Sequence, residues 1–336
     1  MSVDLTNEQL VKNISALLEN ARNRVVVAVN QTIVLTYFEI GRMIVEDEQN
    51  GENRAEYGKA VLKDLSLHLT EKFGKGFSQR NLEQMRQFYL SYSISQTVSA
   101  KFNLSWSHYL KLMRIKDNNE RKFYEIESYK NNWSLRELQR QYDSALYTRL
   151  SLSKNKEEIL QLAEKGQIIE KPKDLIKDPY VLEFLGLSEK PNYSESDLES
   201  ELIDKLEHFL LELGNGFTFV GRQQRISFEE KHFYIDLVFY NRILRCSVLI
   251  DLKIGELKHQ DIGQMQMYVN YFDRERRIEG ENKTIGIILC QDKSEALVQY
   301  TLPEDNDQIF ASKYFTVLPS KEDFINILNS DNGKTS

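Results

Sequence analysis

The sequence predicts two domains: a mainly helical N-terminal domain and an α/β domain whose elements run helix, three strands, helix and strand (αβββαβ). Through residues 1–150, apolar residues recur at helical spacing without convincing strand alternation. In residues 194–336, by contrast, strand-like apolar runs lie between helical segments. A chain of 336 residues is long enough to bury two cores. Residues 151–193 hold three of the five prolines, and we interpret them as a connector.

The N-terminal domain is expected to consist of helices joined by short turns. Ser78 follows the turn Gly74-Lys-Gly-Phe and is typical of a helix N-cap, as is Ser105. Helices are therefore expected over residues 8–48, 57–73 and 117–129, and after Ser78, Ser105 and Trp133.

The α/β domain is expected to begin with an amphipathic helix over residues 197–213, which Gly214 ends. Cys246 and Cys290 both lie inside apolar runs, so we predict buried thiols rather than a disulfide or a metal site. The elements after the helix are strands at residues 217–228, 232–240 and 244–252, a helix at 261–273 and a strand at 284–290.

Composition indicates a soluble globular protein, with 41% hydrophobic and 28% charged residues. No apolar run approaches the ~18 residues that a membrane span needs. The first residues lack the basic start and apolar stretch of a signal peptide. We therefore expect a cytoplasmic protein without a membrane partner.

Charge is distributed unevenly along the chain. The net charge is −7, yet residues 71–150 hold 14 Lys and Arg against 8 Asp and Glu. This surplus fits either a surface that contacts nucleic-acid phosphates or an ordinary solvated helical surface. The aromatic residues between these cations are more typical of a core than of a stacking platform. The basic candidates are Arg80, Arg86, Lys111, Arg114, Lys116, Arg121, Arg136 and Arg140.

Three residues of the α/β domain suggest chemistry. Asp236 interrupts an apolar strand, and Asp251 ends the next one, with Lys253 two positions later on the same strand face. A buried carboxylate needs a partner or a cation, and Mg²⁺ takes one or two carboxylates together with waters and phosphate oxygens. A neighbouring lysine can position water or neutralise a phosphate, which suffices for metal-assisted phosphodiester hydrolysis. The alternative is a surface Asp–Lys pair and an unrelated Asp236.

The order of these elements and acids resembles the PD-(D/E)xK nuclease core, the restriction-endonuclease-like fold. Gln264 and Tyr268 on the following helix look like the Gln-xxx-Tyr motif of its RecB-like branch, which would turn both side chains toward the metal site. Members of this superfamily often carry a metal-binding carboxylate on the first helix. Glu199 and Glu201 are the candidates, and only one of them can face the sheet. We favour Glu199.

The resemblance extends to the YhcG family of bacterial nucleases and covers nearly the whole chain. The motifs that carry it are Gly76-Phe-Ser78, Leu104-Ser-Trp106-Ser-His-Tyr109, Phe219-Val-Gly-Arg-Gln223, Ile235-Asp-Leu-Val-Phe-Tyr240, Asp251-Leu-Lys253, Gly263-Gln264 and Ile285-Gly-Ile-Ile-Leu-Cys290. In that family a helical or winged-helix-like domain precedes the nuclease core. One departure is Asp251, because the family often has glutamate at this third-strand position.

The resemblance implies a nuclease that uses Mg²⁺, or Mn²⁺ in its place, and acts on nucleic acid, with DNA favoured, in defence or DNA processing. Asp236, Asp251 and Glu199 would hold the metal, Lys253 would act on water, and Gln264 and Tyr268 would support it. A homo-oligomer or a protein partner is also expected. Arg222 and Gln223 fit phosphate contacts, and a structural role for Gln223 fits equally well. The alternative function is a non-catalytic DNA-binding or complex-assembly subunit that retains the nuclease fold.

Overall fold

The structure is a computed structural model that describes residues 3–50, 54–93, 102–151, 156–187, 193–228 and 231–317. The chain divides into two compact units, Met1–Gln139 and Arg140–Ser336. Residues 318–336, which the sequence assigns to the second domain, lie outside the described residues.

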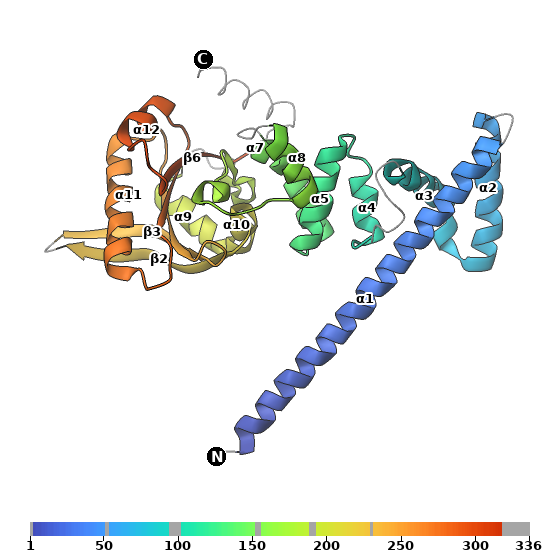
Figure 1. Cartoon of the computed structure of the whole chain (residues 1–336), viewed down its shortest axis with the longest axis horizontal. Coiled ribbons are helices and arrows are strands. Elements are labelled where there is room, and N and C mark those ends of the chain that lie inside the picture. The colour runs from blue at the N-terminus through green and yellow to red at the C-terminus, as the bar shows by residue number, and fades with distance from the viewer. Residues whose placement is uncertain are drawn as a thin grey trace. The chain divides into compact units, whose positions relative to one another are not determined.

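The described part of the first unit is helical, as predicted, and contains no strand (Figure 1). Ser78 caps α3, because its side chain accepts a hydrogen bond from the amide of Asn81. Ser105 occupies the N-cap position of α4, as predicted, but its side chain makes no capping hydrogen bond, and its hydroxyl instead lies 2.7 Å from Nδ1 of His108. The elements are α1 (Val3–Asn50), α2 (Arg54–Phe73), η1 (Lys75–Phe77), α3 (Gln79–Tyr92), α4 (Trp106–Leu112), α5 (Asn118–Lys130) and α6 (Leu135–Asp143), which crosses into the second unit.

The core of the first unit forms where α3 packs against the C-terminal half of α1. At Gly41 the two helices approach closely, because a Cβ there would lie 2.1 Å from the carbonyl oxygen of Met85. Phe88, Tyr109 and Phe123 are fully buried. The aromatic residues between the cations therefore build the core, as the sequence predicted.

The second unit contains a six-stranded mixed sheet in the order β1-β6-β5-β4-β3-β2. Strands β2, β3 and β4 are antiparallel neighbours, whereas β4, β5, β6 and β1 run parallel. The elements are α7 (Leu146–Ser151), α8 (Lys156–Lys165), η2 (Pro172–Leu175), β1 (Tyr180–Val181), η3 (Glu183–Leu185), α9 (Glu195–Asp204), α10 (Leu206–Leu213), β2 (Phe217–Phe228), β3 (Lys231–Asn241), β4 (Cys246–Leu252), α11 (His259–Tyr271), the π-helical turn η5 (Phe272–Arg276), β5 (Ile285–Cys290), α12 (Glu295–Thr301) and β6 (Ile309–Phe315).

The predicted helix over residues 197–213 is two helices in the structure. The break falls at Lys205, whose side chain donates a 2.9 Å hydrogen bond to the carbonyl of Leu185. Leu198 of α9 and Phe209 of α10 both remain buried in one core cluster. The apolar spacing was therefore interpreted correctly, but it does not reveal the break.

The sheet lies between two helical layers, so the predicted α/β core is confirmed. Residues of α9 and α10 pack on one face of the sheet. Residues of α11 and α12 pack on the other face. Cys246 and Cys290 are buried and free, one in each cluster, as predicted.

Residues 172–187, part of the predicted connector, belong to this unit. β1 pairs in parallel with β6, and Tyr180 and Leu182 are fully buried in the cluster beneath α9 and α10. Short 3₁₀ turns and a two-residue strand leave no sequence periodicity to detect. The core of the α/β domain is therefore larger than the predicted residues 194–336.

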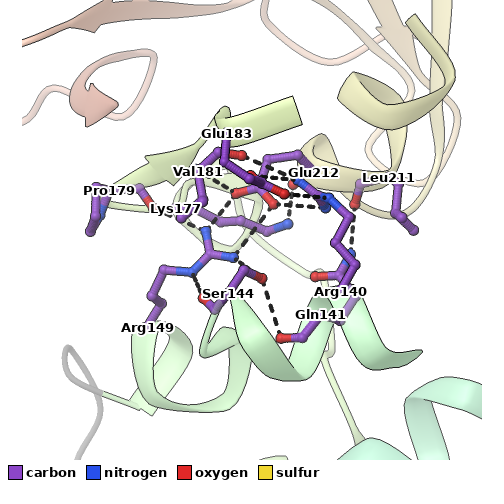
Figure 2. A network of polar contacts seen from close by, with 10 residues as sticks. All are labelled: Arg140, Gln141, Ser144, Arg149, Lys177, Pro179, Val181, Glu183, Leu211 and Glu212. Atoms are coloured by element: carbon purple, nitrogen blue, oxygen red, sulfur yellow. Dashed lines mark hydrogen bonds and ion pairs between the residues drawn. The ribbon is translucent and has the colours of Figure 1, made fainter. Parts of the chain in front are cut away.

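A buried polar network joins α6 and α7 to α10 and β1 (Figure 2). At its centre Glu212 is completely buried, and its carboxylate lies 2.5 Å from Nη1 of Arg149, whose side chain is equally buried. Arg140 reaches the same carboxylate at 3.4 Å, and the Lys177 ammonium donates to the Glu212 carbonyl. The backbone amide of Val181 also donates to Glu212 Oε1, at 3.0 Å.

The network keeps Glu212 ionised in the protein interior. Burial alone would raise the pKa of Glu212, but Arg149, Lys177 and Arg140 together lower it to about 2. Removing one partner of such a buried ion pair destabilises the protein, because it leaves a buried charge without full compensation. The network therefore fixes residues 140–151 to the α/β core.

Candidate active site

Two carboxylates lie opposite each other on adjacent antiparallel strands. The register of β3 and β4 pairs Leu237 with Ile250, so the next positions outward are Asp236 and Asp251. Oδ2 of Asp236 accepts a 2.8 Å hydrogen bond from the amide of Leu252. Asp251 is almost fully buried, with 1% of its surface exposed. The sheet therefore brings together the two acids that the sequence places on neighbouring strands.

The two acids affect each other strongly. The pKa of Asp251 is raised to about 7, first by burial and then by the negative charge of Asp236. Lys253 opposes this shift through its charge and its hydrogen bond. A cation bound between two neighbouring carboxylates would reduce the repulsion between their negative charges.

Lys253 follows β4 directly and is fixed in place by the sheet. Its backbone amide donates a 2.8 Å hydrogen bond to the carbonyl of Leu289 on β5. Its Nζ lies 2.8 Å from Oδ2 of Asp251 and 3.9 Å from Oε2 of Glu195. Burial alone would lower the pKa of Lys253, but Asp251, and more weakly Glu195 and Asp236, raise it above its ordinary value. The ammonium therefore stays charged beside the two acids.

Glu199 on α9 faces the same site through a glutamine. Nε2 of Gln223 donates to Oε2 of Glu199 at 2.6 Å and to Oδ1 of Asp236 at 3.1 Å. Burial, and then the charge of Asp236, raise the pKa of Glu199, while the Gln223 hydrogen bond lowers it. Glu201 instead pairs with Lys205, at 3.3 Å, within the helical segment. Of the two helix candidates, Glu199 is the one near the acids.

Gln223 has an unusual backbone for a strand residue. Its φ of 46° lies in the left-handed region, which a residue other than glycine rarely adopts. It lies between Arg222 and Gln224, which pair across the ribbon with Leu237 and Ile235, the two neighbours of Asp236. The positive φ therefore occurs at the residue whose side-chain amide contacts both carboxylates. Of the two roles that the sequence left open, these contacts favour positioning.

Glu195 is a site residue that the sequence did not single out. In addition to its contact with Lys253, its Oε1 accepts a 3.2 Å hydrogen bond from the amide of Ile254. An acidic residue in the first turn of a helix is common and stabilising on its own. No spacing therefore distinguishes Glu195 from the other first-turn acid, Asp197.

Gln264 and Tyr268 contact each other on α11, but the contacts seen here join them to β3 rather than to Lys253. The Gln264 amide donates to the Tyr268 hydroxyl, which in turn donates a 2.8 Å hydrogen bond to the carbonyl of Tyr234. Tyr268 is fully buried, and burial raises its pKa, with Asp251 and Asp236 adding to the shift. The pair therefore holds α11 against the strand that carries Asp236.

Tyr268→Phe should lower the free energy of unfolding of the second unit by about 1–3 kcal/mol, because the change removes both hydrogen bonds of the buried hydroxyl, from Gln264 and to Tyr234, without leaving a cavity. Chemical denaturation of the wild type and the variant measures this. Cleavage should fall only modestly. A complete loss of cleavage in a fully folded variant would instead give the hydroxyl a direct chemical role.

The residues fit a hard divalent cation through two carboxylates. Over the residues that the structure describes, no three His, Cys, Asp or Glu side chains form a group that could hold a metal ion. The three predicted metal ligands, Glu199, Asp236 and Asp251, do not form one group, because the side-chain amide of Gln223 lies between Glu199 and Asp236. Mg²⁺ needs only one or two carboxylates and keeps several waters. Asp236 and Asp251 satisfy that requirement.

Known families match both units of the chain. Residues 173–328 match the family described as the YhcG PDDEXK nuclease domain, and residues 13–149 match the DUF1016 N-terminal domain. The protein of Escherichia coli (strain K12) named "Putative nuclease YhcG" is 40% identical over 345 aligned residues. The alignment covers 94% of this chain and 92% of that protein. The family resemblance and the restriction-endonuclease-like fold class are thus confirmed.

Solved structures with a similar segment are more distant. A repair endonuclease from Pyrococcus abyssi is 18% identical, and the match covers 36% of this chain and 47% of that one, with a TM-score of 0.27. EndoMS in a complex with dsDNA is 16% identical over 38% of this chain and 46% of its own, with a TM-score of 0.28. The matches span about half the length of those chains.

Proposed function

Because the chain belongs to the YhcG family, whose C-terminal part is a PDDEXK nuclease domain, we propose that it is a metal-dependent nuclease that hydrolyses phosphodiester bonds in DNA. One observation carries the proposal: Asp236 and Asp251 lie opposite each other, with the Lys253 ammonium 2.8 Å from Asp251. A scaffold has no need for a buried carboxylate, Asp251, held beside a second acid that repels it.

The roles follow from the contacts. Asp236 and Asp251 would hold Mg²⁺, or Mn²⁺, which when bound polarises a phosphoryl oxygen and lowers the pKa of a bound water. Glu199 would join them only if the Gln223 amide, which now links it to Asp236, turned away. Lys253 places a fixed positive charge beside the acids, where it can orient the attacking water or neutralise charge that develops on the phosphate.

Glu195 would position Lys253 together with Asp251. Its carboxylate contacts both the Lys253 ammonium and the amide of the following residue. Gln264 and Tyr268 would act indirectly, because they hold α11 against the strand that carries Asp236. Glu195, Lys253, Gln264 and Tyr268 would thus support the two acids from neighbouring elements.

The basic residues predicted to contact phosphates favour DNA as the substrate, although three of them are engaged in contacts within the protein. Arg86 pairs with Glu48 at 2.6 Å, and Arg121 donates to the carbonyl of Ser91 at 2.9 Å. Arg140 belongs to the buried network of the second unit. The exposed candidates are Arg80, Arg114, Lys116 and Arg136.

Replacing these four exposed cations with glutamine should weaken binding of duplex DNA and flatten its salt dependence. Each phosphate contact that is lost lowers the slope of log affinity against log salt by ~0.9. Fluorescence anisotropy of labelled duplex between ~50 and ~200 mM salt measures both quantities. The matched control replaces four exposed cations of the second unit, Arg274, Arg276, Arg277 and Lys283. An equal or larger effect in the control would contradict a leading role for the first unit.

The substrate class is tested by incubating the purified chain with supercoiled, linear and single-stranded DNA and with RNA, with Mg²⁺ or with a chelator. The proposal predicts cleavage of DNA only when the metal is present. Preferential cleavage of RNA would retain the chemistry but change the substrate. If none of these substrates is cut, the chain is better described as a DNA-binding or assembly subunit.

A further inference from the structure

Helix α1 carries a long apolar stripe that the rest of the described chain leaves uncovered. Val11, Ile14, Leu18 and Val25 are 60%, 47%, 56% and 63% exposed. Leu10, Leu17, Val29 and Leu35 lie beside them and are exposed as well. Helices α2, α3 and α4 pack against α1, on which burial begins at Val34 and continues at Ile44 and Val45 (Figure 1).

The stripe has the spacing of a coiled coil. Its positions alternate between steps of three and four, and seven of the eight are apolar: Val11, Ile14, Leu18, Ala21, Val25, Ala28, Thr32 and Leu35. A helix that serves only as a spacer in water has no reason to keep this repeat. The spacing therefore indicates that another helix lies along α1.

Thr32, the one polar residue in the repeat, already has a hydrogen-bond partner within its own helix. The hydroxyl of Thr32 donates a 2.9 Å hydrogen bond to the carbonyl of Ala28 within α1. Thr36, which follows the repeat, does the same to the carbonyl of Thr32 at 2.8 Å. Covering the stripe therefore leaves neither hydroxyl without a partner, so the usual cost of burying a polar group is avoided.

We propose that residues 10–35 of α1 pair with the same segment of a second copy of the chain, which makes the protein a homodimer. The segment is ~38 Å long, and its apolar half offers roughly 600 Å². Two such surfaces bury ~1,200 Å² in total, which reaches the lower limit of stable specific interfaces. In a symmetric pair each stripe covers the other, so one contact removes both exposed surfaces from water.

A lipid surface fits this segment less well than a second helix. A membrane-surface helix carries a strongly basic polar face. Here the polar positions between residues 10 and 25 include Glu19 as well as Lys12, Arg22 and Arg24, beside Asn13 and Asn20. Moreover, no described helix is long and apolar enough to cross a membrane.

The test measures the mass of the full chain in solution by sedimentation equilibrium over a range of concentrations. The stripe variant is Leu18→Glu with Val25→Glu. Its matched control is Ala16→Glu with Val27→Glu, which adds the same charge at two exposed positions on the opposite face of the helix. Glutamate has a higher helix propensity than valine and one close to that of leucine, so α1 should remain helical.

The wild type and the control should be dimers with similar dissociation constants. The stripe variant should dissociate at concentrations more than ~100-fold higher, because four apolar side chains per dimer are lost and four like charges are brought together. Circular dichroism shows whether helix content is retained. A monomeric wild type would overturn the proposal, and so would a stripe variant that remains as dimeric as the control. Because no part of the nuclease site is changed, the result is independent of whether the chain cleaves DNA.

Discussion

Lys253→Ala should reduce metal-dependent cleavage by about 10²–10⁴-fold, the range expected when a positioned proton-transfer or charge-stabilising group is removed. The Lys253 ammonium lies 2.8 Å from Asp251, and its backbone is fixed by β5. No other lysine lies within ion-pair distance of the two acids among the described residues. The variant should fold, because the backbone hydrogen bonds of Lys253 do not depend on its side chain.

Single-turnover cleavage at matched DNA occupancy measures the effect on chemistry alone. The control is Lys283→Ala, an exposed lysine of the same unit, which should cleave like the wild type. Lys253→Arg keeps the charge but changes its shape, so it should recover part of the rate if charge matters most. Wild-type rates in Lys253→Ala would show that Lys253 takes no part in the chemistry.

Arg149→Ala should lower the free energy of unfolding of the second unit by about 3–5 kcal/mol, because it removes one partner of a buried ion pair. Arg149 also donates hydrogen bonds to the carbonyls of Ser144 and Pro179, at 2.9 and 3.0 Å. Glu212 would retain Arg140 and Lys177, so the lower end of the range is expected. Urea denaturation, with amide exchange in β4 and β5 as the local probe, measures the change.

Glu295→Ala is the matched control for this prediction. Glu295, also in the second unit, forms an ion pair with Lys293 at 3.1 Å, but its side chain is 64% exposed. Exposed pairs contribute at most about 1 kcal/mol. Equal losses in Arg149→Ala and Glu295→Ala would mean that the buried network does not hold residues 140–151 to the core.

The residues of the candidate site that could be predicted from the sequence are those that strand periodicity makes visible. Asp251 and Lys253 share a face because side chains alternate along a strand, and Asp236 stands out because it interrupts an apolar run. Their meeting depends on the register of β3 and β4, which no local pattern encodes. The family resemblance supplied that information. It also pointed to a carboxylate on the first helix, for which we favoured Glu199 over Glu201.

The parts that could not be predicted depend on contacts between distant segments. Gln223 reaches Glu199 and Asp236 only because its backbone adopts a positive φ within a strand. No local pattern shows that Glu212 is buried and that its charge is neutralised by arginines more than sixty positions away. The short strand β1 carries no alternation that a sequence pattern could show. Each of these features arises from tertiary structure rather than from local propensity.

The central claim is that Asp236 and Asp251 form the metal-dependent cutting site, and Asp251→Asn tests it most directly. The substitution keeps the size of the side chain but removes the charge that a divalent cation needs. The measurement is single-turnover cleavage of DNA with Mg²⁺ by the wild type and the variant, alongside calorimetric titration of each with the metal. We predict that the wild type binds metal and cleaves DNA, whereas Asp251→Asn stays folded but does neither. Equal cleavage by both proteins, or metal binding that is unchanged in the variant, would contradict the account.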